Sequence, residues 1–210
     1  MIKITLTKGY SLVEVLVSIT ILLLALVGPM TIASQGIKSA TFALEQNTAF
    51  FLAQEGLEIM FALRSNYALE EFEDEYGLES DTPGEQWDWV NEGNGGLGGC
   101  SLIGPTDTCD IGVDFGDLVL DSDNFVDCSS DPEDCRLYFD DEPNKIVYTH
   151  DSDDGAGGIL PQSPYTRIIT VTYITQFVAE VTSEVSWTSS VFGGATQTVE
   201  ATTRLYDLFI

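Results

Sequence analysis

The sequence predicts an α+β protein: a long N-terminal helix packed on a C-terminal antiparallel β-sheet, with a cysteine-containing insert between them. Three observations lead to this fold class. Residues 15–37 carry no charged side chain. Residues 49–64 repeat apolar side chains at spacings of three and four, which is one face of a helix. Residues 166–205 are rich in β-branched side chains and alternate apolar with polar residues, which is typical of strands that bury one face.

The first part of the helix, residues 10–37, is apolar and long enough to cross a bilayer, which needs about 20 helical residues. Lys3 and Lys8 precede it, and few basic residues lie beyond Lys38. The positive-inside rule therefore predicts a single span in the cytoplasmic membrane, with the N-terminus in the cytoplasm and the rest of the chain outside.

The helix is predicted to continue as an amphipathic segment over residues 38–65. Its apolar stripe comprises Ala49, Leu52, Ala53, Gly56, Ile59, Met60 and Leu63. Gly56 costs about 1 kcal/mol relative to alanine inside a helix, so we expect it to mark a close approach to the sheet.

Glu14 is the unusual residue of the apolar segment, because it has hydrophobic neighbours on both sides. A carboxylate at mid-bilayer costs roughly 2.5–3.5 kcal/mol on insertion scales. Two interpretations account for it. Glu14 lies at headgroup depth and reaches water, or it awaits a positively charged partner.

The residues before Glu14 favour the second interpretation. The segment KGYSLVEVLVSI, Lys8 to Ile19, resembles the cleavage and methylation motif of type IV prepilins. An ordinary secretory signal has its apolar stretch before the cleavage site, whereas here the apolar stretch follows the small residue. By this resemblance residues 1–9 are a leader ending at Gly9, Tyr10 is the new N-terminus, and Glu14 is the fifth-position acid. Tyr10 departs from the commoner phenylalanine but keeps an aromatic ring.

The resemblance implies a pilin-like fold and a role in filament assembly. A prepilin peptidase cuts and methylates such chains, an inner-membrane platform assembles them, and the fifth-position acid meets the amino terminus of a neighbouring subunit. The partners implied are therefore other pilin or pseudopilin subunits, with membrane lipid around the helix before assembly. The segment AFFLAQEGLEIMFALR, Ala49 to Arg64, also resembles the corresponding part of minor pilins and pseudopilins.

Charge and composition exclude other classes of function. The 210 residues include 8 Lys and Arg against 34 Asp and Glu, a formal net charge of −26. Such a surface repels nucleic-acid phosphates, so we expect no nucleic-acid partner. His150 is the single histidine, and no nucleophile with a plausible base stands out, so we do not expect an enzyme.

The four cysteines lie in the predicted insert, residues 66–164: Cys100, Cys109, Cys128 and Cys135. An even number of cysteines in an exported domain indicates disulfides. Three connectivities are available, and the short loops favour the local pairs Cys100–Cys109 and Cys128–Cys135. A tetrathiolate zinc site is the weaker alternative, because no close CxxC pair occurs.

Acidic residues of the insert are candidate calcium ligands, and otherwise no cofactor is expected. Asp151 and Asp153 belong to a DSDDG stretch that resembles a calcium-binding loop, although the distal bidentate Glu of an EF-hand is missing. Asp121, Asp123 and Asp127 form a second candidate cluster. The alternative is that both sets are solvated loops.

The last part, residues 165–210, predicts an antiparallel meander with a turn at Gly193-Gly194. In its second strand Phe177, Ala179, Val181, Val185 and Trp187 share one face, and in its third strand Val199, Ala201 and Leu205 do so. This sheet fits the pilin-like fold, and the resemblance to prepilins implies a minor pilin or a type II secretion pseudopilin that ends in a cell-surface or extracellular filament. The alternative is a single-span, membrane-anchored acidic module, with or without calcium, that does not polymerise.

Overall fold

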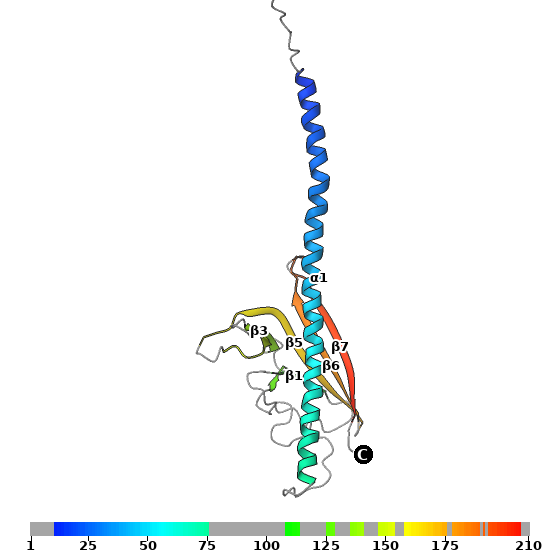
Figure 1. The fold of residues 1–210 in the computed structure, drawn as a ribbon, viewed down its shortest axis with the longest axis vertical. Helices are drawn as coiled ribbons and strands as arrows, with labels where there is room; N and C mark the ends of the chain where they lie inside the picture. Colours follow the sequence, from blue (N-terminus) through cyan, green and yellow to red (C-terminus); the bar gives the residue numbers. More distant parts are fainter. Residues whose placement is uncertain are drawn as a thin grey trace, which may run out of the picture. The chain divides into compact units, whose positions relative to one another are not determined.

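The computed structural model describes residues 11–75, 108–113, 125–128, 135–140, 147–153, 158–175, 178–189, 191 and 193–206. The chain divides into two compact units, Met1–Leu44 and Glu45–Ile210. One helix, α1 (Leu12–Glu75), runs through the boundary between them. All the described strands belong to the second unit (Figure 1).

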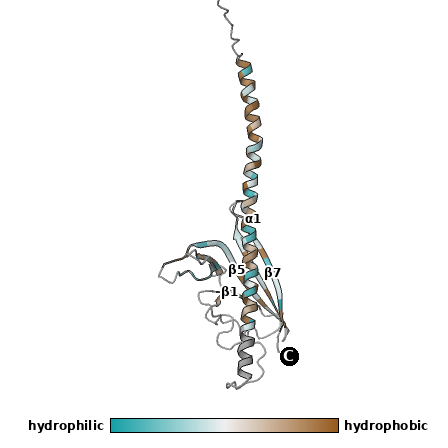
Figure 2. Cartoon of the chain, viewed as in Figure 1, coloured by the Kyte–Doolittle hydropathy of each residue, from teal (hydrophilic) through white to brown (hydrophobic). Residues whose placement is uncertain are grey.

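The described part of the first unit is helical from Leu12 onward, and its side chains are exposed over most of its length. Over Leu12–Ser65 the helix is long and apolar enough to cross a membrane, and none of the apolar window is buried. Hydrophobic colouring predominates along this part of α1 in Figure 2. The predicted long apolar N-terminal helix is confirmed.

The second unit holds an antiparallel sheet. Its described strands are β1 (Thr108–Val113), β2 (Phe125–Asp127), β3 (Arg136–Asp140), β4 (Val147–Thr149), β5 (Gln162–Thr175), β6 (Val178–Thr188) and β7 (Thr196–Tyr206). β5, β6 and β7 pair in chain order, as the predicted meander requires. Gly193 and Gly194 both adopt positive φ, 69° and 85°, in the turn before β7, which confirms the predicted turn.

β5 connects the parts of the sheet because it is long enough to pair with three other strands. One of its edges pairs with β6 along its length. On its other edge, β3 pairs with the stretch from Gln162 to Thr166, and β1 pairs with the stretch from Ile169 to Thr172. Each of these short strands also pairs with a strand of its own hairpin: β3 with β4, and β1 with β2. The strands of the insert are therefore part of the same sheet as the meander.

The core lies between the Glu45–Ser65 stretch of α1 and one face of the sheet. Ile59, Met60 and Leu63 of α1 pack with Ile111, Val113, Ile169, Val171, Ala179, Val181 and Leu205. The whole predicted stripe from Ala49 to Leu63 is buried. A Cβ on Gly56 would collide with Ser183 Oγ on β6, so the glycine does permit the close approach predicted for it.

Candidate functional site

The first turn of α1 is capped by Ser11. The Glu14 N–H donates to the Ser11 carbonyl at 3.0 Å and meets the Ser11 hydroxyl at 3.4 Å, and the Val15 N–H donates to the same carbonyl at 3.2 Å. The Glu14 carboxylate thus lies in the first turn, where the helix dipole favours negative charge. The predicted processing residues Gly9 and Tyr10 lie outside the described residues.

The apolar segment around and after Glu14 shows hydrophobic side chains on every face of the helix. The exposed fractions of its large apolar residues run from 46% at Val15 to 77% at Leu12. A helix that is apolar all round belongs in a bilayer or among other helices. This segment therefore requires a covering that the described part of the chain does not supply.

The hydroxyl groups in this segment are bonded within the helix. Ser18 Oγ donates to the Glu14 carbonyl at 2.8 Å, and Thr20 Oγ1 donates to the Leu16 carbonyl at 2.7 Å. Thr31 Oγ1 lies 2.8 Å from the Gly28 carbonyl, beside Pro29, which has no N–H to contribute to the helix. Because these groups do not need water, the segment is compatible with hydrocarbon or with tight helix packing.

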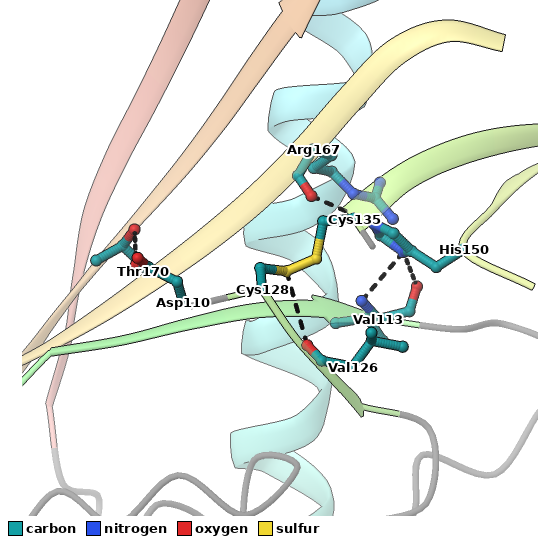
Figure 3. Close-up of a disulfide and its surroundings, with 8 residues drawn as sticks. All are labelled: Asp110, Val113, Val126, Cys128, Cys135, His150, Arg167 and Thr170. Atoms are coloured by element: carbon teal, nitrogen blue, oxygen red, sulfur yellow. Dashed lines mark hydrogen bonds between the residues drawn. A yellow bond between two sulfur atoms is a disulfide. The ribbon is translucent and has the colours of Figure 1, made fainter. Parts of the chain in front are cut away.

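A disulfide links Cys128, which follows β2, to Cys135, which begins the β3 segment (Figure 3). Both cysteines are buried, and their Cα atoms lie 5.7 Å apart. The predicted local pair Cys128–Cys135 is confirmed. Cys109 is also disulfide-bonded, whereas Cys100 lies outside the described residues, so the pair Cys100–Cys109 stays a prediction.

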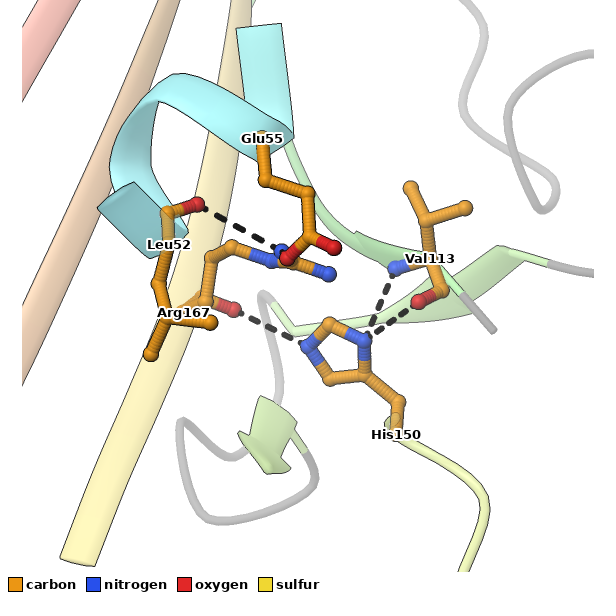
Figure 4. A network of polar contacts seen from close by, with 5 residues as sticks. All are labelled: Leu52, Glu55, Val113, His150 and Arg167. Carbon is orange, nitrogen blue, oxygen red and sulfur yellow. Dashed lines mark hydrogen bonds and ion pairs between the residues drawn. The ribbon is translucent and has the colours of Figure 1, made fainter. Parts of the chain in front are cut away.

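A partly buried ion pair joins α1 to β5 (Figure 4). Arg167 points from β5 toward the helix and is fully buried. Its Nη1 donates to Glu55 Oε2 at 2.7 Å and lies 3.4 Å from the Leu52 carbonyl. Burial lowers the pKa of Arg167, and the charge and hydrogen bond of Glu55 oppose that shift. The pair fixes the position of the helix on the sheet, because an unpaired charge there would be costly.

His150 fills the break in the β1–β5 ladder. The last β1–β5 pair is Ile111 with Ile169, and the same register would next place Val113 opposite Arg167. Instead the imidazole lies between them: Nδ1 is 3.1 Å from the Val113 N and 2.6 Å from the Val113 O, and Nε2 is 3.2 Å from the Arg167 O. Either neutral tautomer keeps a hydrogen bond to Val113.

The environment of His150 favours the neutral ring. Its pKa is lowered from 6.5 to about 4, first because burial disfavours the charged form and second because of the positive charge of Arg167. The hydrogen bonds to backbone carbonyls oppose this shift but do not cancel it. Gly112 is adjacent, and a Cβ there would lie 2.9 Å from Cys135 Sγ and 3.0 Å from His150 Cδ2. Cys135, His150 and Gly112 therefore form one tightly packed cluster.

The structure places only some of the predicted calcium ligands. Asp127 and Asp153 are exposed, and Asp151 is half-buried. Asp151 Oδ1 accepts the Asp153 N–H at 2.8 Å, a turn closed within the loop itself. Asp121 and Asp123 lie outside the described residues. Within the described ranges, no three His, Cys, Asp or Glu side chains gather closely enough to hold a metal ion.

Comparisons with protein families, with characterised proteins and with solved structures find no match for this chain. Two features of the chain bear on its function: the apolar helix that begins at Leu12, and the polar contacts that hold the second unit together.

Proposed function

We propose that this chain is a minor pilin or pseudopilin subunit. A prepilin peptidase removes residues 1–9 and methylates Tyr10, and the mature chain assembles through its apolar helix into a type IV pilus-like filament. The observation that supports this most is the combination of an uncovered, all-round apolar helix with a carboxylate in its first turn, directly after the Gly9-Tyr10 motif.

The exposed apolar residues of α1 explain why the chain needs two successive environments. Before assembly, lipid covers them, with the N-terminus in the cytoplasm and the disulfide-containing unit outside, where thiols are oxidised. After assembly, the helices of neighbouring subunits cover one another. The internally bonded hydroxyls of Ser18, Thr20 and Thr31 suit both environments.

Glu14 supplies the recognition step in this proposal. Cleavage after Gly9 creates an α-amino group on Tyr10, whose reference pKa of about 7.7–8.0 leaves it largely protonated at neutral pH. Pairing of this ammonium with the Glu14 carboxylate of a neighbour neutralises two charges in an apolar setting. A subunit in the wrong register leaves both unpaired, which typically costs about 3–5 kcal/mol. The pair thus selects subunits that have docked correctly.

The test measures processing and incorporation separately. Mass spectrometry of the cell-derived protein should find an N-terminal methylated Tyr10, and Gly9→Val should block cleavage. Glu14→Gln should be inserted and cleaved normally, yet be incorporated about 100-fold less than wild type when the two compete, since about 3 kcal/mol corresponds to a factor of more than about 100. Glu58→Gln is the control, because it removes an exposed charge from the same helix. Normal incorporation of Glu14→Gln would contradict the pairing, and an intact Met1 in assembled material would contradict the assignment.

One observation favours the alternative of a membrane-anchored acidic module that does not polymerise. Ser11 and Glu14 form an ordinary capped helix start, in which a first-turn carboxylate is stabilised by the helix dipole without a partner. That alternative predicts a monomer that stays in the membrane and no incorporation defect for Glu14→Gln. Its calcium-binding form predicts that calcium raises the melting temperature and that Asp151→Asn abolishes the increase.

A further inference from the structure

Among the strands that the structure describes, β7 lies at an edge of the sheet. Among the described strands it pairs only with β6, over eleven residue pairs without a register shift. Natural edge strands are commonly protected by proline, lysine, bulges or short length. β7 contains no proline and no lysine, and it is eleven residues long. On its core-facing side, Val199 and Ala201 are only half-buried.

The outward face of β7 contains an acid, Glu200, opposite which the described part of the sheet places no cation, although Thr202 Oγ1 donates a hydrogen bond to Glu200 Oε1 at 3.3 Å. Glu200 lies directly opposite Glu184 of β6, and like charges in that arrangement repel. Further along the strand, Arg204 Nε donates to Glu180 Oε2 at 2.9 Å, but the Arg204 side chain remains 58% exposed. Arg204 can therefore bind a second carboxylate. A positively charged side chain opposite Glu200 would reduce the repulsion between Glu200 and Glu184.

We propose that β7 is an interface at which two copies of this chain join their sheets, antiparallel, about a two-fold axis at Thr202. This register places Glu200 of each copy opposite Arg204 of the other. On the core-facing side it places Val199 opposite Leu205 and Ala201 opposite Thr203. The strand is thus complementary to itself in charge and in apolar character, as a two-fold interface requires.

Other symmetric registers lack this complementarity. Moving the axis to Glu200 would place Glu200 opposite its own copy, and moving it to Arg204 would do the same for the arginine. An axis at Ala201 or Thr203 would leave both charged residues opposite uncharged ones. An axis midway between two residues would pair outward-facing residues of one copy with core-facing residues of the other, so the two sheets could not share their faces. The charges of β7 therefore select the axis at Thr202.

The proposal does not depend on the filament function. A two-fold axis perpendicular to the sheet reverses every direction in its plane, so the Glu45–Ser65 stretches of the two helices run in opposite directions. Neighbours within one filament of parallel helices cannot pair in this way. The interface joins free subunits, or subunits of two separate filaments, and its loss should leave incorporation into a filament unchanged.

Cysteine crosslinking of the full chain in detergent micelles tests the axis. Directly opposite residues have Cβ atoms about 4.5–5.5 Å apart, close to the separation that a disulfide needs. Thr202→Cys should therefore form a disulfide-linked dimer on oxidation with diamide. Thr198→Cys is the matched control: it is exposed on the same face, but the two copies of residue 198 lie about 27 Å apart along the strand in this register.

Thr202→Cys should crosslink at least about ten-fold more than Thr198→Cys at about 150 mM salt, where the repulsion between the two acidic copies is screened beyond about 8 Å. Adding Glu200→Arg should lower the yield to the control level, because it sets a second arginine opposite Arg204 of the other copy. The same change places an arginine opposite Glu184, so it should not lower the melting temperature. Equal yields at residues 198 and 202, or a yield unchanged by Glu200→Arg, would overturn the proposal.

Discussion

Replacing Gly56 by alanine tests the contact between α1 and the sheet. In an isolated helix this change stabilises by about 1 kcal/mol. Here the new Cβ would collide with Ser183 Oγ and would lie 3.1 Å from Ser183 Cβ and 3.4 Å from Arg167 Cδ. Ser183 is on β6, which is held between β5 and β7, and Arg167 is held by Glu55. The backbone of Ser183 and the side chain of Arg167 are therefore held in place.

Overpacking of this kind typically costs about 1–3 kcal/mol, so Gly56→Ala should destabilise the second unit by up to about 2 kcal/mol after the helix gain is subtracted. Ser183→Ala should cost little by itself, because the buried Ser183 Oγ has no hydrogen-bond partner in the described structure. Together the two changes should remove the collision with the hydroxyl and leave only the tight 3.1 Å contact with the Cβ of residue 183. We therefore expect a coupling of about 1–2 kcal/mol in the double-mutant cycle.

Thermal unfolding followed by circular dichroism measures the cycle, and Gly36→Ala is the control. Gly36 lies in the same helix, but a Cβ there would meet nothing within 4 Å, so this change should not destabilise the protein. If Gly56→Ala is more stable than wild type by the full helix gain of about 1 kcal/mol, or if its effect simply adds to that of Ser183→Ala, the close approach of helix and sheet at this residue is refuted.

Three further predictions concern the buried polar groups and the cluster around them. Glu55→Ala should lower the free energy of unfolding by about 2–3 kcal/mol in a urea titration, because it leaves the buried Arg167 charge without its partner. Arg167→Met should cost less, because the charge that it leaves unpaired is that of Glu55, whose side chain is 40% exposed and can reach water. His150 has a pKa of about 4 in the folded chain and 6.5 in the unfolded chain. The unfolded chain therefore binds the extra proton first, and about 3 kcal/mol of stability present above pH 6.5 should be lost as the pH falls to 4. The pH–stability curve of His150→Gln should lack this loss. Gly112→Ala should lower the free energy of unfolding by about 1–3 kcal/mol by crowding Cys135 and the imidazole, and an unchanged melting temperature would contradict the tight packing there.

The sequence predicted the elements whose signal is local. The helix follows from apolar spacing, and the turn at Gly193-Gly194 follows from the need for positive φ. The pairing of the insert's strands with β5 was not predictable in this way. β1 and β3 share one edge of β5, although β2, β3 and β4 all lie between β1 and β5 in the chain. Short strands of three to six residues contain too little pattern to specify a distant partner.

For the ion pair between Arg167 and Glu55, the sequence indicated that a buried charge needs a partner but did not identify which residue the partner is. Tyr165, Arg167, Ile169 and Val171 alternate on β5, so Arg167 occupies a core-facing position, and a charge in that position demands a buried partner. Three acidic residues of the helix could have been this partner: Glu45, Glu55 and Glu58. Only the position of the helix on the sheet selects Glu55. The role of His150 was harder to predict from the sequence. Its role depends on the place where the β1–β5 ladder stops, and that place is fixed by the meeting of two hairpins on β5 rather than by any residue near His150 in the chain.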